Sequence, residues 1–340
     1  MTDFFKKMTE CIENHDTIYL MTHSTPDLDG MGSAIAFNEI LRKMGKECYI
    51  IAPKNLINKS LIKAVSYLEE NDIVIPFIYE KNINFNGDLL IILDTQEKDL
   101  VESKSILDKE CDRIVIDHHS RGINIIDDCV CSYLDDSKSS IIEIVCEYLK
   151  YLNYSLDKKY YTIMFAGLYV DTNGFSLKTS SRTFEIASFL INGGVDNEKW
   201  QSFLKNSMED VLNMYSYIEK CVKLDKDVYL CEVSDKFCSS VELAMIANKI
   251  MKFENVKIAF AVGLSDSSTV LISARSTDKV DVSKIMRNFG GGGHYSAAAA
   301  RVTSQSIESI ISDIKKYVKE WYICVLFYLR ILKNKEKRMI

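Results

Sequence analysis

Short apolar runs alternate with amphipathic stretches through the first half of the chain. Four of the apolar runs have the length and bulk of buried strands: residues 16–23, 46–53, 87–95 and 111–119. Three of the amphipathic stretches have helical spacing: residues 30–45, 137–150 and 157–170. Strands that alternate with helices favour a parallel sheet that is covered on both faces. We therefore expect an α/β domain with a parallel sheet flanked by helices in this half.

The second half has a different pattern of apolar positions. Its predicted helices cover residues 181–191, 196–222 and 237–252, and its predicted strands cover 228–233, 256–263 and 268–276. The last two strands are joined by the short polar segment LSDS, which predicts a hairpin. A hairpin beside helices is typical of a smaller mixed α/β domain.

These patterns divide the chain into four predicted segments. They are a first domain (1–190), a helical linker (191–222), a second domain (223–320) and an apolar and basic tail (321–340). The apolar part of the tail, Trp321 to Leu332, is interrupted by Arg330 and is shorter than the about 20 residues that a spanning helix needs. We interpret it as a packed terminal helix, with peripheral membrane contact and oligomer contact as the alternatives.

Composition and charge narrow the class of protein. The chain has 340 residues and a formal net charge of -6, which argues against a surface that binds long nucleic acid. A small anionic substrate held by a local group of cations stays compatible with that charge. The first residues lack the apolar core of a signal peptide, and the 10 cysteines form no C-x-x-C pair. We therefore expect a cytoplasmic protein with unpaired thiols.

Acids and histidines gather where predicted strands end. They are His23, Asp27, Asp29, Asp94, Asp117, His118 and His119, with Asp171 after the 157–170 helix. Because ligands bind beyond the carboxyl ends of parallel strands, we expect these side chains along one rim of the sheet. Each alone is more typical of a turn or a helix cap, but the chain has only 5 histidines in all.

The combination of these side chains predicts a metal site. Carboxylates alone suit Mg²⁺ or Ca²⁺, whereas carboxylates with imidazoles suit Mn²⁺, Fe or Zn. Two neighbouring ions need a bridging carboxylate and several terminal ligands. Six residues supply enough ligands for two ions: His23, Asp27, Asp29, Asp94, His118 and Asp171.

A second group of residues lies far downstream, in the predicted smaller domain. Gly290 to Gly293 form a glycine run that precedes His294, and Arg275 lies near the end of a predicted strand. Exposed backbone N–H groups beside an arginine and a histidine can cradle a phosphate or a carboxylate. The alternative is a flexible glycine turn before a tightly packed alanine segment.

At these residues the chain resembles the DHH phosphoesterase superfamily, in the group with a DHH-associated C-terminal domain. The motifs are HSTPDLDGMGS (23–33), LLIILDT (89–95), DHH (117–119), GLYVDTNGF (167–175), SARS (273–276) and FGGGGH (289–294). The resemblance covers residues 1–320, is greatest to the nanoRNase/pAp phosphatase (NrnA-type) branch, and leaves the tail unmatched.

The resemblance implies two divalent metal ions, most often Mn²⁺, and a role for each site residue. One ion would be held by His23, Asp27 and Asp94, and the other by Asp29, Asp94, His118 and Asp171. Asp117 would orient His118, and His119 would face the scissile phosphate. The substrate would be gripped by residues of the smaller domain: Arg275, Ser276, Gly290, Gly291, Gly292, Gly293 and His294.

The resemblance also implies the reaction. We expect a metal-dependent phosphodiesterase that cuts short oligoribonucleotides to nucleoside 5'-monophosphates, with pAp as a further substrate. The first alternative is a phosphodiesterase of cyclic or linear dinucleotides such as cyclic di-AMP or pApA. A nucleotide-binding protein without catalysis is the alternative from another class, and the complete ligand set counts against it. A homodimer is left open.

Overall fold

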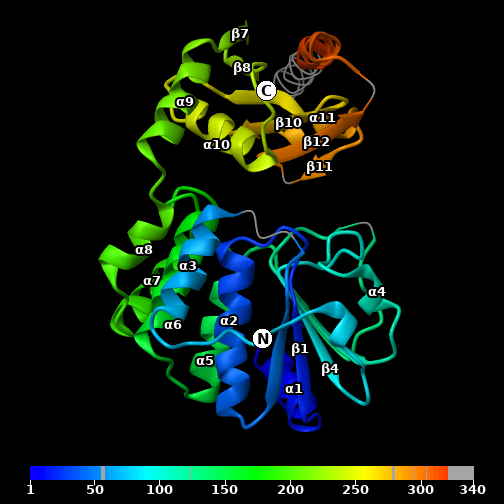
Figure 1. Ribbon diagram of the computed structural model, residues 1–340, viewed down its shortest axis with the longest axis vertical. Helices are drawn as coiled ribbons and strands as arrows, with labels where there is room; N and C mark the ends of the chain where they lie inside the picture. The colour runs from blue at the N-terminus through cyan, green and yellow to red at the C-terminus, as the bar shows by residue number, and fades with distance from the viewer. Residues whose placement is uncertain (55–57, 123, 278–279, 294, 304, 321–340) are drawn as a thin grey trace, which may run out of the picture. The chain divides into compact units, whose positions relative to one another are not determined.

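The computed structural model describes residues 1–54, 58–122, 124–277, 280–293, 295–303 and 305–320. The chain forms two compact units, Met1–Lys205 and Asn206–Ile340, which Figure 1 shows in blue to green and in green to red. This division falls within the segment that the sequence predicts as a linker. The predicted domain limits at residues 190 and 222 stay predictions.

The first unit is built on a six-stranded parallel sheet with the order β3-β2-β1-β4-β5-β6. Its strands are β1 (Thr17–Met21), β2 (Glu47–Ile51), β3 (Phe77–Ile78), β4 (Leu89–Leu93), β5 (Asp112–Asp117) and β6 (Cys131–Leu134). The four predicted strands are confirmed as β1, β2, β4 and β5. The edge strands β3 and β6 escaped prediction because they are short and neither is fully buried.

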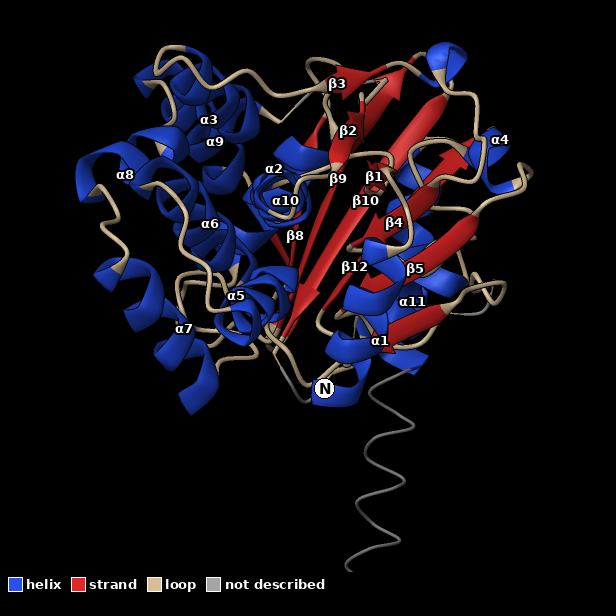
Figure 2. Cartoon of the chain, turned by 90° about the horizontal axis from the view of Figure 1, so that it is seen from below, coloured by secondary structure: helices blue, strands red, loops and turns tan. Residues whose placement is uncertain are grey.

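One face of this sheet packs against most of the helices of the unit (Figure 2). These helices are α1 (Thr2–Glu13), α2 (Leu28–Lys43), α3 (Lys59–Glu69), α5 (Ile141–Leu152), α6 (Lys158–Asp171), α7 (Ser181–Asn192) and α8 (Asn197–Leu204). The other face packs against loops and the short segments η1 (Glu80–Asn82) and α4 (Lys104–Leu107). The predicted α/β architecture is confirmed, with long helices on one face and mainly loops on the other.

The strand order reverses beside β1, and this reversal positions the site. The chain runs from β1 outward through β2 to β3 and then returns to β4, which pairs with the other side of β1. The loops that leave β1 and β4 therefore diverge at neighbouring carboxyl ends, where open parallel sheets bind ligands. His23 and Asp94 lie in these two loops.

Close packing of α2 against α6 brings a further acid to the same rim. A Cβ atom on Gly167 of α6 would lie 2.6 Å from the carbonyl oxygen of Leu28, so only glycine permits this approach of the two helices. Asp171 at the end of α6 therefore lies near Asp29 at the start of α2.

The second unit contains a six-stranded mixed sheet with the order β11-β12-β10-β9-β8-β7. Its strands are β7 (Val222–Asp225), β8 (Val228–Val233), β9 (Ile258–Asp266), β10 (Thr269–Ser276), β11 (Gly292–Gly293) and β12 (Ala297–Thr303). Its helices are α9 (Met208–Glu219), α10 (Ser240–Ile250), α11 (Val282–Arg287) and a segment at 307–320. The predicted hairpin is confirmed as β9 and β10. The predicted helix at 196–222 is instead broken into α8 and α9.

Two further predictions concern membrane-spanning helices and the cysteine thiols. Among the described residues, no helix combines the length and the apolar character that crossing a membrane requires. The described cysteines are all unpaired thiols, as the sequence predicts. The tail at 321–340 lies outside the described residues, and the cytoplasmic location and the homodimer stay predictions.

Candidate metal centre and its surroundings

The strand ends of the first unit bring acids and histidines together around His118. The Nε2 atom of His118 lies 3.2 Å from Asp94 Oδ1, 3.6 Å from Asp29 Oδ2 and 3.6 Å from Asp171 Oδ2. His23 Nε2 lies 3.5 Å from the other carboxylate oxygen of Asp94. Residues that are far apart in the sequence therefore surround a single point at the rim of the sheet.

Two groups of potential ligands meet at this point. His23, Asp27 and Asp94 form one group, and Asp29, His118 and Asp171 form the other. Within each group the ligand atoms lie within 4.8 Å of one another. All six residues that the sequence predicts as ligands therefore lie close together, and Asp94 contacts a histidine of each group.

Asp94 is held in an unusual conformation directly after β4. Its φ angle is 65°, which a residue other than glycine seldom adopts, and its N–H donates to the carbonyl of Ile116 at 2.9 Å. Its side chain is buried, and Oδ1, although 3.2 Å from His118 Nε2, receives no hydrogen bond of good geometry within the described chain. A strained residue with an unsatisfied buried oxygen is typical of a functional site.

The start of α2 fixes the two acids of the PDLDG segment in different roles. The Asp27 side chain caps the helix by accepting hydrogen bonds from the N–H groups of Asp29 and Gly30. The Asp29 side chain accepts from the N–H groups of Ile141 and Ile142 at the start of α5, at 2.9 and 3.3 Å. Asp29 therefore supplies the cap that α5 otherwise lacks.

The charged groups of this cluster change one another's pKa values. Burial lowers the pKa values of His23 and His118, but neighbouring carboxylates, above all Asp94, raise them to about 9 and about 10. Burial and nearby acids raise the pKa of Asp29 well above its usual value, and burial chiefly raises that of Asp171 to about 6. Although burial raises the pKa of Asp94, the two histidines hold it well below the usual range.

This electrostatic pattern fits a divalent cation. Several buried carboxylates here depend on protonated imidazoles for compensation, and a bound cation would replace those protons. The mixture of carboxylate oxygens and imidazole nitrogens is the donor set that suits Mn²⁺, Fe or Zn. The unsatisfied Oδ1 atom of Asp94 fits the same interpretation.

The structure corrects one predicted role, because Asp117 contacts His119 and not His118. Asp117 Oδ1 accepts from His119 Nδ1 at 2.7 Å, whereas His118 Nδ1 lies 3.4 Å from the carbonyl oxygen of Lys138. β5 ends at Asp117, and the rings of His118 and His119 lie against each other beyond it, with centroids 4.4 Å apart. Gln96 Nε2 donates to Asp117 Oδ2 at 2.9 Å and fixes the carboxylate.

The predicted substrate residues of the second unit are already partly engaged. Arg275 is largely buried and donates through Nε to Asn248 Oδ1 at 2.8 Å, and through Nη1 to Ser273 Oγ and the Ala274 carbonyl. Ser276 Oγ donates to the carbonyl of Val280 at 2.6 Å. These contacts fix Arg275, while its Nη2 group has no partner among the described residues.

The glycine run differs from the exposed cradle that the sequence predicts. The N–H groups of Gly290 and Gly291 donate to the carbonyls of Arg287 and Met286 at the end of α11, so neither is free for an anion. Gly292 and Gly293 form β11, which pairs with β12. His294 lies outside the described residues.

Known families match both units of the chain. Residues 17–168 match the model of the DHH family, N-terminal domain, and residues 226–320 match that of the DHHA1 domain. The first match covers the strands and loops that carry the His/Asp cluster. The two matches confirm the predicted class, a DHH phosphoesterase.

Two curated relatives cover nearly the whole chain. The cyclic-di-AMP phosphodiesterase GdpP of Bacillus subtilis is 30% identical over 93% of this chain and 49% of its own length. The bifunctional oligoribonuclease and PAP phosphatase NrnA of Mycoplasma genitalium is 23% identical over 90% of this chain and 96% of its own. The chain thus spans about half of the cyclic-di-AMP phosphodiesterases it matches, and it is more similar to them than to the predicted NrnA-type branch.

Solved structures share the fold. An exopolyphosphatase-related protein from Bacteroides fragilis has a TM-score of 0.82 at 19% identity and covers 94% of this chain and 97% of its own. RecJ of Thermus thermophilus in complex with Mn²⁺ has a TM-score of 0.57 at 12% identity, over 94% of this chain and 54% of RecJ. The fold, the cluster and both domain matches agree, and the chain belongs to the DHH phosphoesterases that carry a DHHA1 domain.

Proposed function

We propose that this chain hydrolyses the phosphodiester bonds of adenine dinucleotides, cyclic di-AMP or linear pApA. The observation that carries the reaction is the pair of His/Asp groups that meet at Asp94. The similarity to cyclic-di-AMP phosphodiesterases over nearly the whole chain supports the substrate. The products of complete hydrolysis would be adenosine 5'-monophosphates.

Two divalent cations would occupy the two groups of ligands, and Mn²⁺ is the proposed ion. His23, Asp27 and Asp94 would hold one, and Asp29, Asp94, His118 and Asp171 the other. Cations in such a site lower the pKa of a water molecule and compensate charge on phosphoryl oxygens. The Mn²⁺ complex of RecJ, which shares the fold, supports the choice of ion.

His119 would contact the substrate, and Asp117 would act through His119. The side chain of His119 is 34% exposed, and Asp117 binds its Nδ1 atom at 2.7 Å, which fixes the ring. Burial lowers the pKa of His119, but the Asp117 carboxylate raises it above the usual value. A protonated His119 would donate a hydrogen bond to the phosphodiester, and Asp117 would be a positioning residue.

Residues of the second unit would hold the rest of the substrate. Arg275 retains the donors of Nη2 for a phosphate, and Ser276, the Gly290–Gly293 run and His294 complete the group that the family resemblance suggests. Because the N–H groups of Gly290 and Gly291 are engaged, we assign the charge of this grip to Arg275.

A second candidate function is the hydrolysis of short oligoribonucleotides and of pAp. It is favoured by the match to NrnA, which covers 96% of that protein. A binding protein without catalysis would have no need of the six clustered ligands.

A substrate panel with Mn²⁺ tests the proposal and separates the two candidates. We expect the highest kcat/KM for pApA or cyclic di-AMP, and lower values for pAp and for RNAs of about three to five nucleotides. A higher kcat/KM for the longer RNAs would favour the oligoribonuclease. Absence of turnover on every substrate, with Mn²⁺ bound, would refute both.

A further inference from the structure

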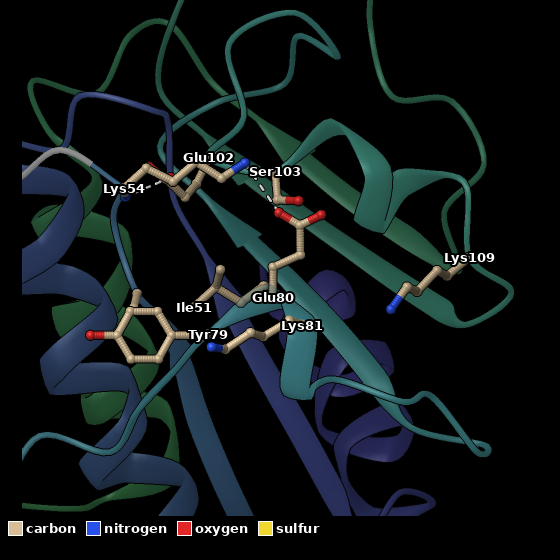
Figure 3. A pocket seen from close by; sticks show the side chains of 9 residues that line it. Ile51, Lys54, Tyr79, Glu80, Lys81, Glu102, Ser103 and Lys109 are labelled. Carbon is tan, nitrogen blue, oxygen red and sulfur yellow. Dashed lines mark hydrogen bonds and ion pairs between the residues drawn. The ribbon is translucent and has the colours of Figure 1, made fainter.

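A pocket of about 500 Å³ opens at the carboxyl ends of β2 and β3 in the first unit. Its walls come from the residues after β2, from the η1 segment and from the segment around α4. In Figure 3, Tyr79 and Lys109 lie on opposite sides of this pocket, and the side chains of Lys54 and Glu80 meet between them. The volume is within the range of sites that bind small molecules.

Glu102 lines this pocket and has a buried acceptor without a donor among the described residues. The residue is only 5% exposed, and its Oε1 atom accepts a hydrogen bond from the backbone N–H of Lys54 at 2.8 Å. Within the described ranges, its Oε2 atom has no donor. Leaving a buried carboxylate oxygen unsatisfied is unfavourable, so a ligand that donates an N–H or O–H group to it would be bound preferentially.

Glu80, the other carboxylate of the pocket, is already compensated. Hydrogen bonds from Ser105, Ser103 and Lys54 lower its pKa to about 2. Its side chain therefore serves to organise the wall, and Glu102 alone offers an unused carboxylate oxygen.

The lining also attracts anions. The pocket is lined by three lysines and two glutamates, although the whole chain carries a net charge of -6. The lysines are Lys54, Lys81 and Lys109. Lys81 is exposed and has no ion-pair partner among the residues that the structure describes. A local surplus of lysines in an acidic protein raises the concentration of phosphate-bearing ligands at that place.

Tyr79 adds an aromatic surface at the rim. Its side chain is 64% exposed, which is unusual for a large ring beside a pocket. Exposed aromatic rings of this kind stack on nucleobases.

The pocket adjoins the His/Asp cluster through shared backbone. Val101 forms an antiparallel bridge with His23, and the N–H of Glu102 donates to the carbonyl of Thr22 at 2.9 Å. The segment that carries Glu102 thus lies directly beside the segment that carries His23. Neighbouring strands lie about 5 Å apart, which is short compared with the length of a dinucleotide.

We propose that this pocket binds one adenosine nucleotide of a dinucleotide whose phosphodiester lies at the His/Asp cluster. The 6-amino group of adenine donates to Glu102 Oε2, Tyr79 stacks on the base, and the lysines attract the phosphate. Adenine offers a single donor group at this edge and fits the one unused oxygen, whereas guanine would need both. This inference rests on the proposed function, because it places part of the same substrate.

Calorimetric titration of the full chain with AMP and with IMP tests the pocket without requiring turnover. IMP has a carbonyl at C6, which would face the Glu102 oxygen, and its N–H donor is at N1 instead, so AMP is expected to bind about tenfold tighter. 2'-Deoxy-AMP is expected to bind like AMP. A loss for 2'-deoxy-AMP together with equal affinities for AMP and IMP would assign Glu102 to the sugar and overturn the base assignment.

Glu102→Gln sharpens the test because it keeps an acceptor for the Lys54 N–H. Its amide N–H₂ would donate to the carbonyl of IMP but would face the amino group of AMP, which is also a donor. The variant should therefore bind IMP more tightly than AMP. Tyr79→Ala should lower the affinity for both nucleotides about tenfold. Tyr154→Ala, at another exposed tyrosine of the first unit, should leave both affinities unchanged.

Two results would overturn the inference: equal affinities for AMP and IMP in the unmodified protein, or a ratio that Glu102→Gln leaves unchanged. Hydrolysis of pApA tests the proposed function independently of AMP binding. Selective AMP binding without hydrolysis of pApA would refute the proposed function and retain the pocket, and hydrolysis without selective AMP binding would do the reverse.

Discussion

Asp117 accepts a hydrogen bond from the ring of His119 at 2.7 Å, whereas His118, between them in the sequence, turns to the cluster of acids. The two adjacent histidines therefore lie in different environments. His118 is buried among three carboxylates, and His119 is partly exposed, with its Nδ1 atom 2.7 Å from Asp117 Oδ1 and 3.7 Å from Asp94 Oδ1. This arrangement predicts different roles for neighbouring residues.

Replacement of each histidine by alanine should separate these roles. His118→Ala should weaken Mn²⁺ binding more than about tenfold, because a ligand is lost. His119→Ala should leave Mn²⁺ affinity within about threefold and lower kcat on pApA about a hundredfold. Calorimetry with Mn²⁺ and steady-state kinetics measure the two effects, and equal losses of metal in both variants would contradict the assignment.

Asp117→Asn should lower kcat through His119. If the carboxylate acts only by fixing and charging that ring, the double variant Asp117→Asn/His119→Ala should be no slower than His119→Ala alone. Additive losses would mean that Asp117 has an independent role. A shift of the pH profile in Asp117→Asn, which a merely structural role would not produce, is the accompanying measurement.

Gly30→Ala should disturb the metal site while leaving the fold intact. A Cβ atom at residue 30 would lie 2.7 Å from Asp94 Oδ2, so this side chain must move, whereas the backbone need not. We expect Mn²⁺ affinity to fall about tenfold with little change in Tm. Gly32→Ala, on the same helix, meets the side chain of Ile163 at 3.3 Å and serves as the control, with Mn²⁺ affinity expected to stay unchanged.

Mn²⁺ should stabilise the protein, because it compensates the buried acids only in the folded state. At about a hundred times Kd, binding at one site adds about 2.7 kcal/mol to the free energy of unfolding. Thermal melts with Mn²⁺ and with a chelator should therefore differ by several degrees. Asp94→Asn should abolish the difference, and an equal shift in that variant would place the ion elsewhere.

The sequence allows the clustering of the six candidate ligands to be predicted, because each follows a recognisable strand or helix. Parallel strands bring their carboxyl ends to one rim, so the position of Asp94 or His118 in the chain indicates its place in the fold. The roles of Asp117 and His119 depend on the direction of each side chain, which the sequence motif alone does not give.

Other features could not be predicted because they depend on contacts between distant segments. Glu102 is an ordinary acidic residue in the sequence, and it becomes notable only where burial leaves one of its oxygens unsatisfied. The glycine run predicts free N–H groups, but two of them complete the end of α11. Neither contact has a local signature in the sequence.

Hydrolysis of pApA by the full chain, followed by chromatography of AMP with Mn²⁺ present, tests the central claim most directly. The account predicts Mn²⁺-dependent release of AMP, with loss of at least about a thousandfold in kcat for Asp94→Asn in a protein that stays folded. AMP release that survives in Asp94→Asn, or intact pApA in the unmodified protein with Mn²⁺ bound, would contradict it.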